Sequence, residues 1–423
     1  MPEHHDKRRM ASQAGKPERA RFDPVASSTT PAQPSTLRCL LLDPSLYTAP
    51  YDAALTGGLL AAGVQPVWAT RPTRRGDEPE IPPEHVVPLF YGRTDDVDGP
   101  AWLRSVAKGL SHLVALVRLI RLTRQVQPDV VHVQWAVLPL IDAAALWLIR
   151  LRRPLIMTVH DPTPYNGARL SCLQGLGFDL PISLADQVIV HTRSGRQTLT
   201  ARGIDARKIT VVPHGPLRLR AAPRPRPTDG DPRWTFVLFG EIKPYKGLDV
   251  LVEAIGRLDS DVRRRLRVIV AGRPRMDLAP ILARIEALSL QATIEVRARR
   301  LADQEVADLF AEADCFVFPY REIDASGVYF LTKALGKWLI ASRVGVFAED
   351  LVDGRDGVLI PSADPDALAS ALEHATLTRP AAVTPAVADS WKDIGHSTRL
   401  VYERAVGAAQ AALPVGHQGR ADA

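Results

Sequence analysis

Residues 234–258 read WTFVLFGEIKPYKGLDVLVEAIGRL. The apolar run at 235–239 predicts a buried strand, and the apolar spacing of residues 248–258 predicts a helix that follows it. The loop between them, residues 240–247, carries two lysines. A strand, a short loop and a helix in this order form the repeating unit of a parallel sheet, so the stretch predicts an α/β fold.

The same alternation of short apolar runs and amphipathic stretches extends along the chain in both directions. Each predicted strand is mostly leucine or β-branched and is bounded by Pro, Gly, Asp or His. Ligands of such sheets bind beyond the carboxyl ends of the strands, so the loops there form the candidate site. The other predicted strands are residues 37–42, 64–69, 130–133, 154–159, 187–191 and 209–212 in the first half and 266–271, 292–296 and 315–318 in the second.

One segment interrupts this alternation. Residues 218–233, RLRAAPRPRPTDGDPR, contain four prolines and no apolar period, and we predict that they link two domains. A chain of 423 residues exceeds the usual size of one core, which favours the same division. We predict an N-terminal domain at 37–217, a C-terminal domain at 234–390, a helix at 391–412 that crosses back to the first domain, and disordered tails at 1–36 and 413–423.

Composition excludes several classes of protein. The three cysteines, Cys39, Cys172 and Cys315, are far apart and without metal-ligand spacing, which argues against disulfides and zinc and favours the cytoplasm. The net charge of +6 indicates an anionic partner, such as a nucleotide phosphate or a lipid headgroup. Aromatic residues make up 6% of the chain and no nucleic-acid-binding motif is present, so we expect no nucleic acid partner.

The sequence offers no membrane span, because no stretch of 18 apolar residues is uninterrupted. Residues 102–124 have apolar residues at helical spacing, with leucines also among the cations. This pattern suits a helix that lies on an anionic membrane surface, and it equally suits a packed helix with a solvated basic face. We predict peripheral attachment to the inner leaflet.

The first candidate motif is the loop that carries Lys243 and Lys246. It joins a strand to a helix, where backbone amides and the helix dipole attract phosphate. The alternative is a solvated turn whose lysines bind nothing. Because the loop lies at a strand end in the expected nucleotide domain, we predict that the two lysines bind a diphosphate.

The second candidate motif follows the predicted strand at 315–318. The amides of Gly327 and Val328 would begin a helix and could hold a distal phosphate, while Asp324 or Glu322 could bind sugar hydroxyls. A simpler role for Asp324 or Ser326 is to cap that helix. The two roles are compatible.

In the first half of the chain, His160 ends the predicted strand at 154–159. There it could hydrogen-bond a sugar hydroxyl or stabilise charge in a transition state. Taken alone, a histidine in a loop is more often structural. For His132, His191 and His214 we keep the structural interpretation.

At this point the chain resembles the GT-B glycosyltransferases, specifically the retaining family four with its exopolysaccharide and lipopolysaccharide enzymes. The resemblance covers roughly residues 37–405 and rests on FGEIKPYKGLDVLVEAI, FVFPYREIDASGVYFLTKALGKWLIAS and VVPHGP. It implies two Rossmann-like domains around a cleft, a nucleotide-diphosphate sugar donor, and a glycan or lipid-linked acceptor. It also implies donor-diphosphate binding by Lys243 and Lys246 and a catalytic role for His160.

The resemblance departs from the family pattern in the acidic motif. Many members carry two glutamates there, and the corresponding residues are Ile323 and Leu331. The chain is similar instead to a subgroup with an aspartate and a Ser-Gly-Val stretch, which makes Asp324 the catalytic candidate. In this fold the loop after the first strand serves the acceptor, and Tyr47 or Tyr51 could contact it.

The resemblance implies a retaining reaction. We expect no cofactor and no metal, because no DxD pair follows a strand and the lysines would replace a metal's charge. An epimerase or glycoside phosphorylase of the same fold remains an alternative. So does a non-catalytic GT-B binding protein, given the missing glutamates.

Overall fold

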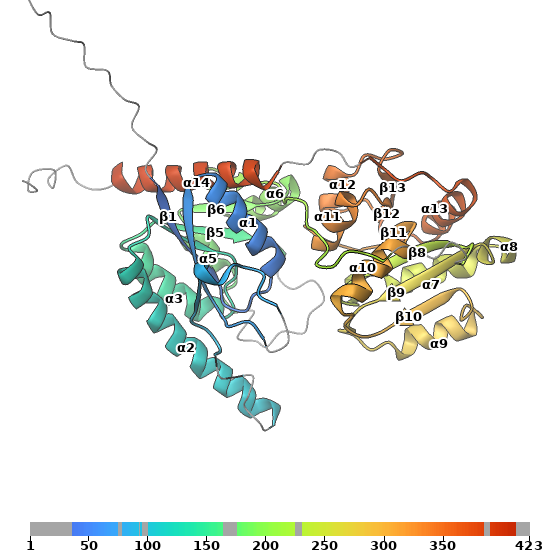
Figure 1. The fold of residues 1–423 in the computed structure, drawn as a ribbon, viewed down its shortest axis with the longest axis horizontal. Helices are drawn as coiled ribbons and strands as arrows, with labels where there is room; N and C mark the ends of the chain where they lie inside the picture. The colour runs from blue at the N-terminus through green and yellow to red at the C-terminus, as the bar shows by residue number, and fades with distance from the viewer. Residues whose placement is uncertain are drawn as a thin grey trace, which may run out of the picture. The chain divides into compact units, whose positions relative to one another are not determined.

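The structure, a computed structural model, describes residues 36–74, 78–92, 94, 100–163, 176–224, 231–384 and 390–411. These residues form two parallel sheets, one of seven strands and one of six, each with its own helices (Figure 1). The predicted α/β fold with two Rossmann-like domains is therefore confirmed. The predicted tails, apart from Thr36, lie outside the described residues, as do Cys172 and part of the predicted linker.

The first domain contains most of the chain before residue 218. Its elements are β1 (Leu37–Asp43), α1 (Ala49–Ala61), β2 (Val64–Thr70), η1 (Pro83–His85), β3 (Val86–Pro88), α2 (Ala101–Val126), β4 (Val130–Val133), α3 (Pro139–Arg150), β5 (Leu155–Val159), α5 (Asp179–Leu184), β6 (Gln187–Val190), α6 (Arg193–Ala201) and β7 (Ile209–Val211).

The second domain follows the proline-rich segment, and a last helix ends the described chain. The elements are β8 (Trp234–Phe239), η2 (Pro244–Lys246), α7 (Leu248–Arg257), α8 (Ser260–Arg263), β9 (Leu266–Ala271), α9 (Ala279–Ala287), β10 (Ile294–Arg297), α10 (Asp303–Glu312), β11 (Cys315–Phe318), α11 (Gly327–Ala334), β12 (Trp338–Ser342), α12 (Gly345–Asp350), β13 (Gly357–Ile360), α13 (Pro365–Thr378) and α14 (Trp391–Ala411).

The strands are apolar throughout because both faces of each sheet are covered. In β8, Phe236 and Leu238 belong to one hydrophobic cluster, while Val237 between them belongs to the cluster on the other face. The strands of the first sheet divide in the same way between two clusters. A parallel sheet buried on both faces gives continuous apolar runs, which is why these strands were visible in the sequence.

The strand order places a switch point in each sheet. In the first sheet the order is β3-β2-β1-β4-β5-β6-β7, so the chain reverses its direction of winding between β1 and β4. In the second sheet the order is β10-β9-β8-β11-β12-β13, with the reversal between β8 and β11. Loops that leave adjacent strands at such a point diverge and open a crevice for ligands.

Helix α14 packs on α1 of the first domain, although it follows the second domain in sequence (Figure 1). The two helices approach closely at a pair of glycines: a Cβ added to Gly395 would lie 2.0 Å from the Gly58 carbonyl oxygen. Farther along α14, the hydroxyl of buried Tyr402 lies 2.7 Å from His132 Nδ1 in β4. The helix is therefore part of the core of the first domain.

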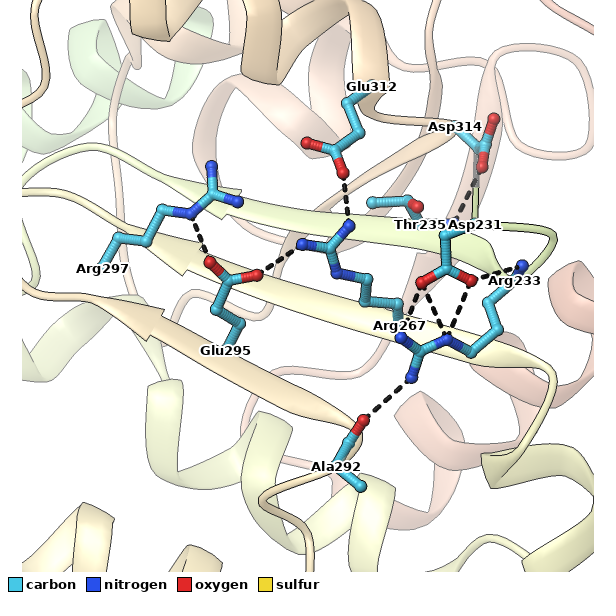
Figure 2. A network of polar contacts seen from close by, with 9 residues as sticks. All are labelled: Asp231, Arg233, Thr235, Arg267, Ala292, Glu295, Arg297, Glu312 and Asp314. Atoms are coloured by element: carbon cyan, nitrogen blue, oxygen red, sulfur yellow. Dashed lines mark hydrogen bonds and ion pairs between the residues drawn. The ribbon is translucent and has the colours of Figure 1, made fainter. Parts of the chain in front are cut away.

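Figure 2 shows a polar network that runs along β9 and β10 of the second sheet and reaches the amino end of β8. Arg267 of β9 pairs with Glu295 of β10 at 2.5 Å and with Glu312 at the end of α10. Arg297 pairs with the same glutamate at 2.6 Å. The network connects β9, β10 and α10 and so ties together this side of the second sheet.

Candidate active site

A cavity of about 460 Å³ opens at the carboxyl ends of both sheets. Its lining comes from the loops after β1, β4 and β5 in the first domain and from those after β8 and β11 in the second. It therefore lies at both switch points, where this kind of sheet binds ligands. Of the predicted site residues, His160, Lys243, Asp324 and Gly327 line it.

The two predicted lysines occupy different environments. Lys243 lines the cavity, and its Nζ lies 3.2 Å from a carboxylate oxygen of Glu241. Lys246 is only 6% exposed; its Nζ donates to the Phe239 carbonyl at 3.3 Å and lies 5.3 Å from the centre of the Tyr320 ring. Burial, with the charge of Lys243 adding to it, lowers the pKa of Lys246 from 10.5 to about 7.

A glycine separates the buried ammonium of Lys246 from open space. Gly240 follows β8 with a φ of +106°, a conformation that residues with side chains rarely adopt. A Cβ at this position would lie 2.7 Å from Lys246 Nζ and 3.4 Å from a methyl carbon of Val328. The bare backbone therefore leaves the lysine within reach of an anion placed against the loop.

The loop between β11 and α11 holds the predicted acidic and phosphate-binding residues. Ser326 caps α11, since its Oγ accepts from the Tyr329 amide at 3.5 Å, and Gly327 begins the helix at the cavity wall. Val328 is partly buried against the core. Glu322 is exposed and does not line the cavity. The amides at the start of α11 are thus presented to the cavity beside Asp324.

Asp324 is buried at this wall and contacts the first domain. Its Oδ1 accepts from the Thr192 hydroxyl at 2.5 Å, and its Oδ2 is buried without a hydrogen-bond partner in the structure. Burial raises the pKa of Asp324 to about 6, and the charge of Glu349 adds to the effect. A buried acceptor oxygen without a partner suits a ligand that brings a hydroxyl donor.

His160 belongs to a cluster of buried histidines. His191 Nδ1 donates to the Val212 carbonyl at 3.0 Å, so its Nε2 must accept, and it lies 3.2 Å from His160 Nδ1. His160 Nε2 lies 2.9 Å from the side-chain carbonyl oxygen of Gln134, so both ring nitrogens of His160 have a polar partner within the cluster. Burial lowers the pKa of His160 well below its usual range, so the ring is neutral.

The structural interpretation of the other three histidines holds for His132, which bonds to Tyr402 and to Thr158. His191 and His214, however, line the cavity. The sequence also missed Trp135, whose ring stacks on His160 at 5.2 Å with an interplanar angle of 11°. The available signal was its place directly after β4, at the switch point of the first sheet.

The loop after β1 is organised by two buried carboxyl groups. Asp43 accepts from the backbone amides of Ser45 and Thr48, each at 3.2 Å, while Asp52 is fully buried at the start of α1. Burial raises both pKa values, and the charge of Asp43 raises that of Asp52 further. The backbone amides favour the charged form of Asp43, whereas burial and the charge of Asp43 both favour the protonated form of Asp52.

We predict that Asp52→Asn keeps stability near pH 7, because the amide has the shape of the carboxyl group and cannot carry a buried charge. The raised pKa of wild-type Asp52 means that stability falls as pH rises above the unfolded-state value of about 4, up to the raised pKa. Urea unfolding between pH 5 and 8 should show this slope in the wild type and a shallower one in the variant. Asp43→Asn is the comparison variant. We expect it to lower the free energy of unfolding by about 1–3 kcal/mol, because one of the buried amides of Ser45 and Thr48 loses its hydrogen-bond acceptor. Equal losses in both variants would contradict the assignment of the proton.

A second cavity, of about 470 Å³, adjoins the first through shared lining residues Tyr47 and Pro50. It reaches the ends of β8 and β9 through Gly240, Glu241 and Gly272. Arginines outnumber the glutamates Glu78, Glu80 and Glu241 on its wall, so its charge is positive, which suits an elongated anionic ligand that extends beyond the first cavity. The arginines on its wall are Arg71, Arg74, Arg220, Arg273, Arg275 and Arg300.

In the described part of the chain, no three His, Cys, Asp or Glu side chains come together so as to hold a metal ion.

Both domains match known glycosyltransferase families. Residues 53–215 match the family described as "Glycosyltransferase Family 4", and residues 233–376 match "Glycosyl transferases group 1". The fold is also that of solved GT-B enzymes: Anabaena Alr3699/HepE in complex with UDP-glucose has a TM-score of 0.60 at 14% identity, covering 89% of this chain and all of that one. The catalytic domain of starch synthase IV from Arabidopsis thaliana, bound to ADP and acarbose, has a TM-score of 0.63 at 12% identity, covering 88% of this chain and 99% of that domain. By fold and family match, the chain falls among the GT-B glycosyltransferases.

Relatives similar in sequence include D-inositol 3-phosphate glycosyltransferases. The protein from Corynebacterium glutamicum is 32% identical over 255 residues, which cover 53% of this chain and 59% of that protein. The protein from Streptosporangium roseum is 27% identical over 418 residues, covering 86% of this chain and 92% of that protein. The names of these relatives do not mention exopolysaccharide or lipopolysaccharide, the type that the family resemblance implied, and that type stays a prediction.

Proposed function

We propose that this protein is a retaining glycosyltransferase. It transfers a sugar from a nucleotide-diphosphate sugar to a hydroxyl of a glycan or lipid-linked acceptor, in the synthesis of bacterial surface or exopolysaccharide. The observation that carries the proposal is that Lys243, the start of α11, His160 and Asp324 share one cavity at the switch points of both sheets. The UDP-glucose complex of Anabaena HepE supports a nucleotide-sugar donor.

In the proposed complex the donor diphosphate lies between the lysine loop and the start of α11. Lys243 and Lys246 neutralise the charge that develops as the bond between sugar and phosphate breaks, and the helix dipole adds to this effect. The nucleotide extends into the basic cavity beyond Gly240. The two lysines supply positive charge at the leaving group, so the reaction needs no metal, and turnover should be unchanged by EDTA.

The sugar lies between His160 and Asp324. Neutral His160 forms a hydrogen bond with one sugar hydroxyl. The Oδ2 of Asp324, which has no partner in the structure, accepts a hydrogen bond from another sugar hydroxyl. The acceptor oxygen bonds to the anomeric carbon on the face that the phosphate leaves. The acceptor's proton passes to an oxygen of the departing diphosphate, so the anomeric configuration is retained.

A nucleotide and donor screen tests this function. UDP, GDP and ADP are compared for thermal stabilisation, since a ligand at 100 times its Kd stabilises the folded state by about 2.7 kcal/mol. A panel of nucleotide sugars is then assayed for hydrolysis and transfer. We expect one nucleotide to stabilise the protein and its sugar conjugate to be turned over.

The other outcomes of the screen identify the alternatives. Conversion of the donor without any acceptor would indicate an epimerase, and conversion that requires inorganic phosphate would indicate a phosphorylase. Stabilisation by a nucleotide without turnover of any donor would indicate a binding protein. If no nucleotide stabilises the protein and no donor is turned over, the proposal is overturned.

Within the described ranges, no helix is both long enough and apolar enough to cross a bilayer.

We propose in addition that the first domain rests on the cytoplasmic face of an anionic membrane. Helix α2 has no acidic residue, and Trp102, Leu110 and Val117 are among its exposed apolar side chains, Trp102 being 67% exposed. Helix α3, beside α2 (Figure 1), exposes Leu140 and Trp147. Apolar faces flanked by cations suit an acidic bilayer. The cations of α2 are Arg104, Lys108, Arg118, Arg121 and Arg124.

Sedimentation with vesicles tests the membrane face. At low salt we expect the protein to sediment with phosphatidylglycerol vesicles and to release as salt is raised, because screening weakens the electrostatic part. Leu110→Asp should abolish binding without loss of stability, since Leu110 is 60% exposed. Leu282→Asp, at an exposed position on α9 of the second domain, is the matched control. Equal binding by wild type and Leu110→Asp would sink the assignment.

A further inference from the structure

A carboxylate stands in the loop that is proposed to bind the donor diphosphate. Glu241 is the second residue after β8, and its side chain lies between two cations. Its Oε2 is 3.2 Å from Lys243 Nζ, and its Oε1 is 2.6 Å from Arg275 Nη2. Each oxygen of the Glu241 carboxylate is therefore paired with a different cation.

The backbone of the loop sets this arrangement. The chain is extended at Lys243, with φ −125° and ψ 154°, so successive side chains point to opposite sides. Ile242 is fully buried in the core, which leaves Glu241 and Lys243 together on the outer side. The Ile242 amide donates to the Arg273 carbonyl, and the Ile242 carbonyl accepts from the Arg275 amide, both at 2.9 Å. These bonds hold the loops after β8 and β9 against each other, so the carboxylate and its two cations face one another.

Glu241 stands where the first cavity meets the second. Lys243 lines the first cavity, whereas Glu241 and Arg275 line the second. A nucleotide sugar that extends through both must bring its diphosphate past this carboxylate. Burial raises the pKa of Glu241, but Arg275 and Lys243 lower it by more, so the group is ionised at neutral pH. A negative charge is thus fixed beside the path of an anionic ligand.

We infer that Glu241 competes with the donor diphosphate for Lys243 and thereby speeds release of the nucleoside diphosphate product. When the donor binds, Lys243 leaves Glu241 for the phosphate oxygens, while Arg275 still holds the carboxylate. As the product departs, Glu241 takes Lys243 back. The inference rests on the proposed function, since it assigns a positioning residue in the same donor site.

The competition acts more strongly on the product than on the donor. In the donor both phosphates are esterified, whereas the product has a terminal phosphate. A terminal phosphate has a second pKa of about 6, so near pH 7 the product carries more negative charge than the donor did. The Glu241 carboxylate therefore repels the product more than the donor, which favours release after transfer.

Binding kinetics of the nucleoside diphosphate test the inference. The probe is whichever of UDP, GDP and ADP stabilises the protein in the screen. Glu241→Gln keeps the shape of the side chain and removes its charge, and the variant should fold because the side chain is 40% exposed. We expect the Kd of the probe to fall about fivefold, the size expected for a partly exposed ion pair, through slower dissociation. The KM for the donor should fall by less, and product inhibition should become stronger.

Two controls separate this contact from a general change of charge. Glu78 is exposed on the wall of the same second cavity, so Glu78→Gln removes an equal charge and should change the Kd by less than about twofold. In a Lys243→Met background, Glu241→Gln should no longer tighten binding, because the shared cation is missing. Glu241→Asp keeps the charge and should stay closer to wild type than Glu241→Gln.

The two proposals fail in different ways. If none of the three nucleotides binds, the proposed function fails. If the probe binds the wild type and Glu241→Gln leaves its Kd unchanged, or tightens binding equally in the Lys243→Met background, only the role of Glu241 is wrong. Tightening that comes entirely from faster association would also overturn it, since that result indicates repulsion of the approaching anion and not competition for Lys243.

Discussion

Replacing Lys246 with methionine is expected to lower turnover by at least about a hundredfold while making the protein more stable. The loss of turnover follows because a preorganised cation at the leaving diphosphate contributes several kcal/mol to the transition state. The gain in stability follows from the lowered pKa. Holding the Lys246 pKa at about 7 instead of 10.5 costs on the order of 4 kcal/mol at pH 7, and methionine removes that cost.

Steady-state kinetics and thermal unfolding of the unliganded protein measure the two effects. Lys208→Met is the matched control, because Lys208 also donates to a backbone carbonyl, that of Ala185, but lies away from the cleft. The wild type should also bind its nucleotide more weakly as pH rises through about 7, since the bound diphosphate favours protonated Lys246. Turnover by Lys246→Met within about tenfold of wild type would remove this lysine from the mechanism.

Asp324→Asn is expected to reduce kcat/KM for the donor by about a hundredfold. The substitution keeps the shape of the side chain but replaces one carboxylate oxygen with an amide nitrogen. The hydrogen bond that the carboxylate would accept from a sugar hydroxyl is then lost or weakened. Because the pKa of Asp324 is raised to about 6, the wild-type rate should fall as pH drops through 6. In the Asp324→Asn variant the rate should not show this fall at low pH.

Asp324 also joins the two domains, so its chemical and structural roles must be separated. Thr192→Val removes the hydroxyl that Asp324 accepts from and keeps the carboxylate. It should cost about 1 kcal/mol of stability, since Thr192 also caps α6, and change turnover by less than tenfold. Thr192→Ser should restore the stability. If Thr192→Val lost as much activity as Asp324→Asn, the contact between domains would be the role of Asp324.

The strand and helix units could be predicted because their patterns are local. The run from Thr235 to Phe239 is buried on both faces, and no solvent-facing residue interrupts it. Three strands escaped prediction. Two of them, Val86–Pro88 and Gly357–Ile360, are short edge strands, which have little apolar length to show. The third, Trp338–Ser342, lies within the acidic-motif segment and was not distinguished from it.

The positions of the candidate site residues could be predicted from the sequence, but their surroundings could not. The loops that carry Lys243, His160 and Asp324 could be found from their places after predicted strands, and all three line one cavity. The environments of these residues depend on distant partners. The Asp324 carboxylate meets Thr192 from the other domain, and the Trp135 ring is set by a histidine 25 residues later. Such contacts leave no trace in local spacing.

The packing of α14 on the first domain has a consequence for how the protein is made. During synthesis the whole second domain leaves the ribosome before Ile394, Val401 and Tyr402, which complete a hydrophobic cluster of the first. The first domain therefore reaches its final core only after the rest of the chain has been translated. A chimera that exchanges the first domain between glycosyltransferases must carry residues 391–411 with it. Without them, the strands of the first domain that pack against α14 would be left with an exposed apolar face.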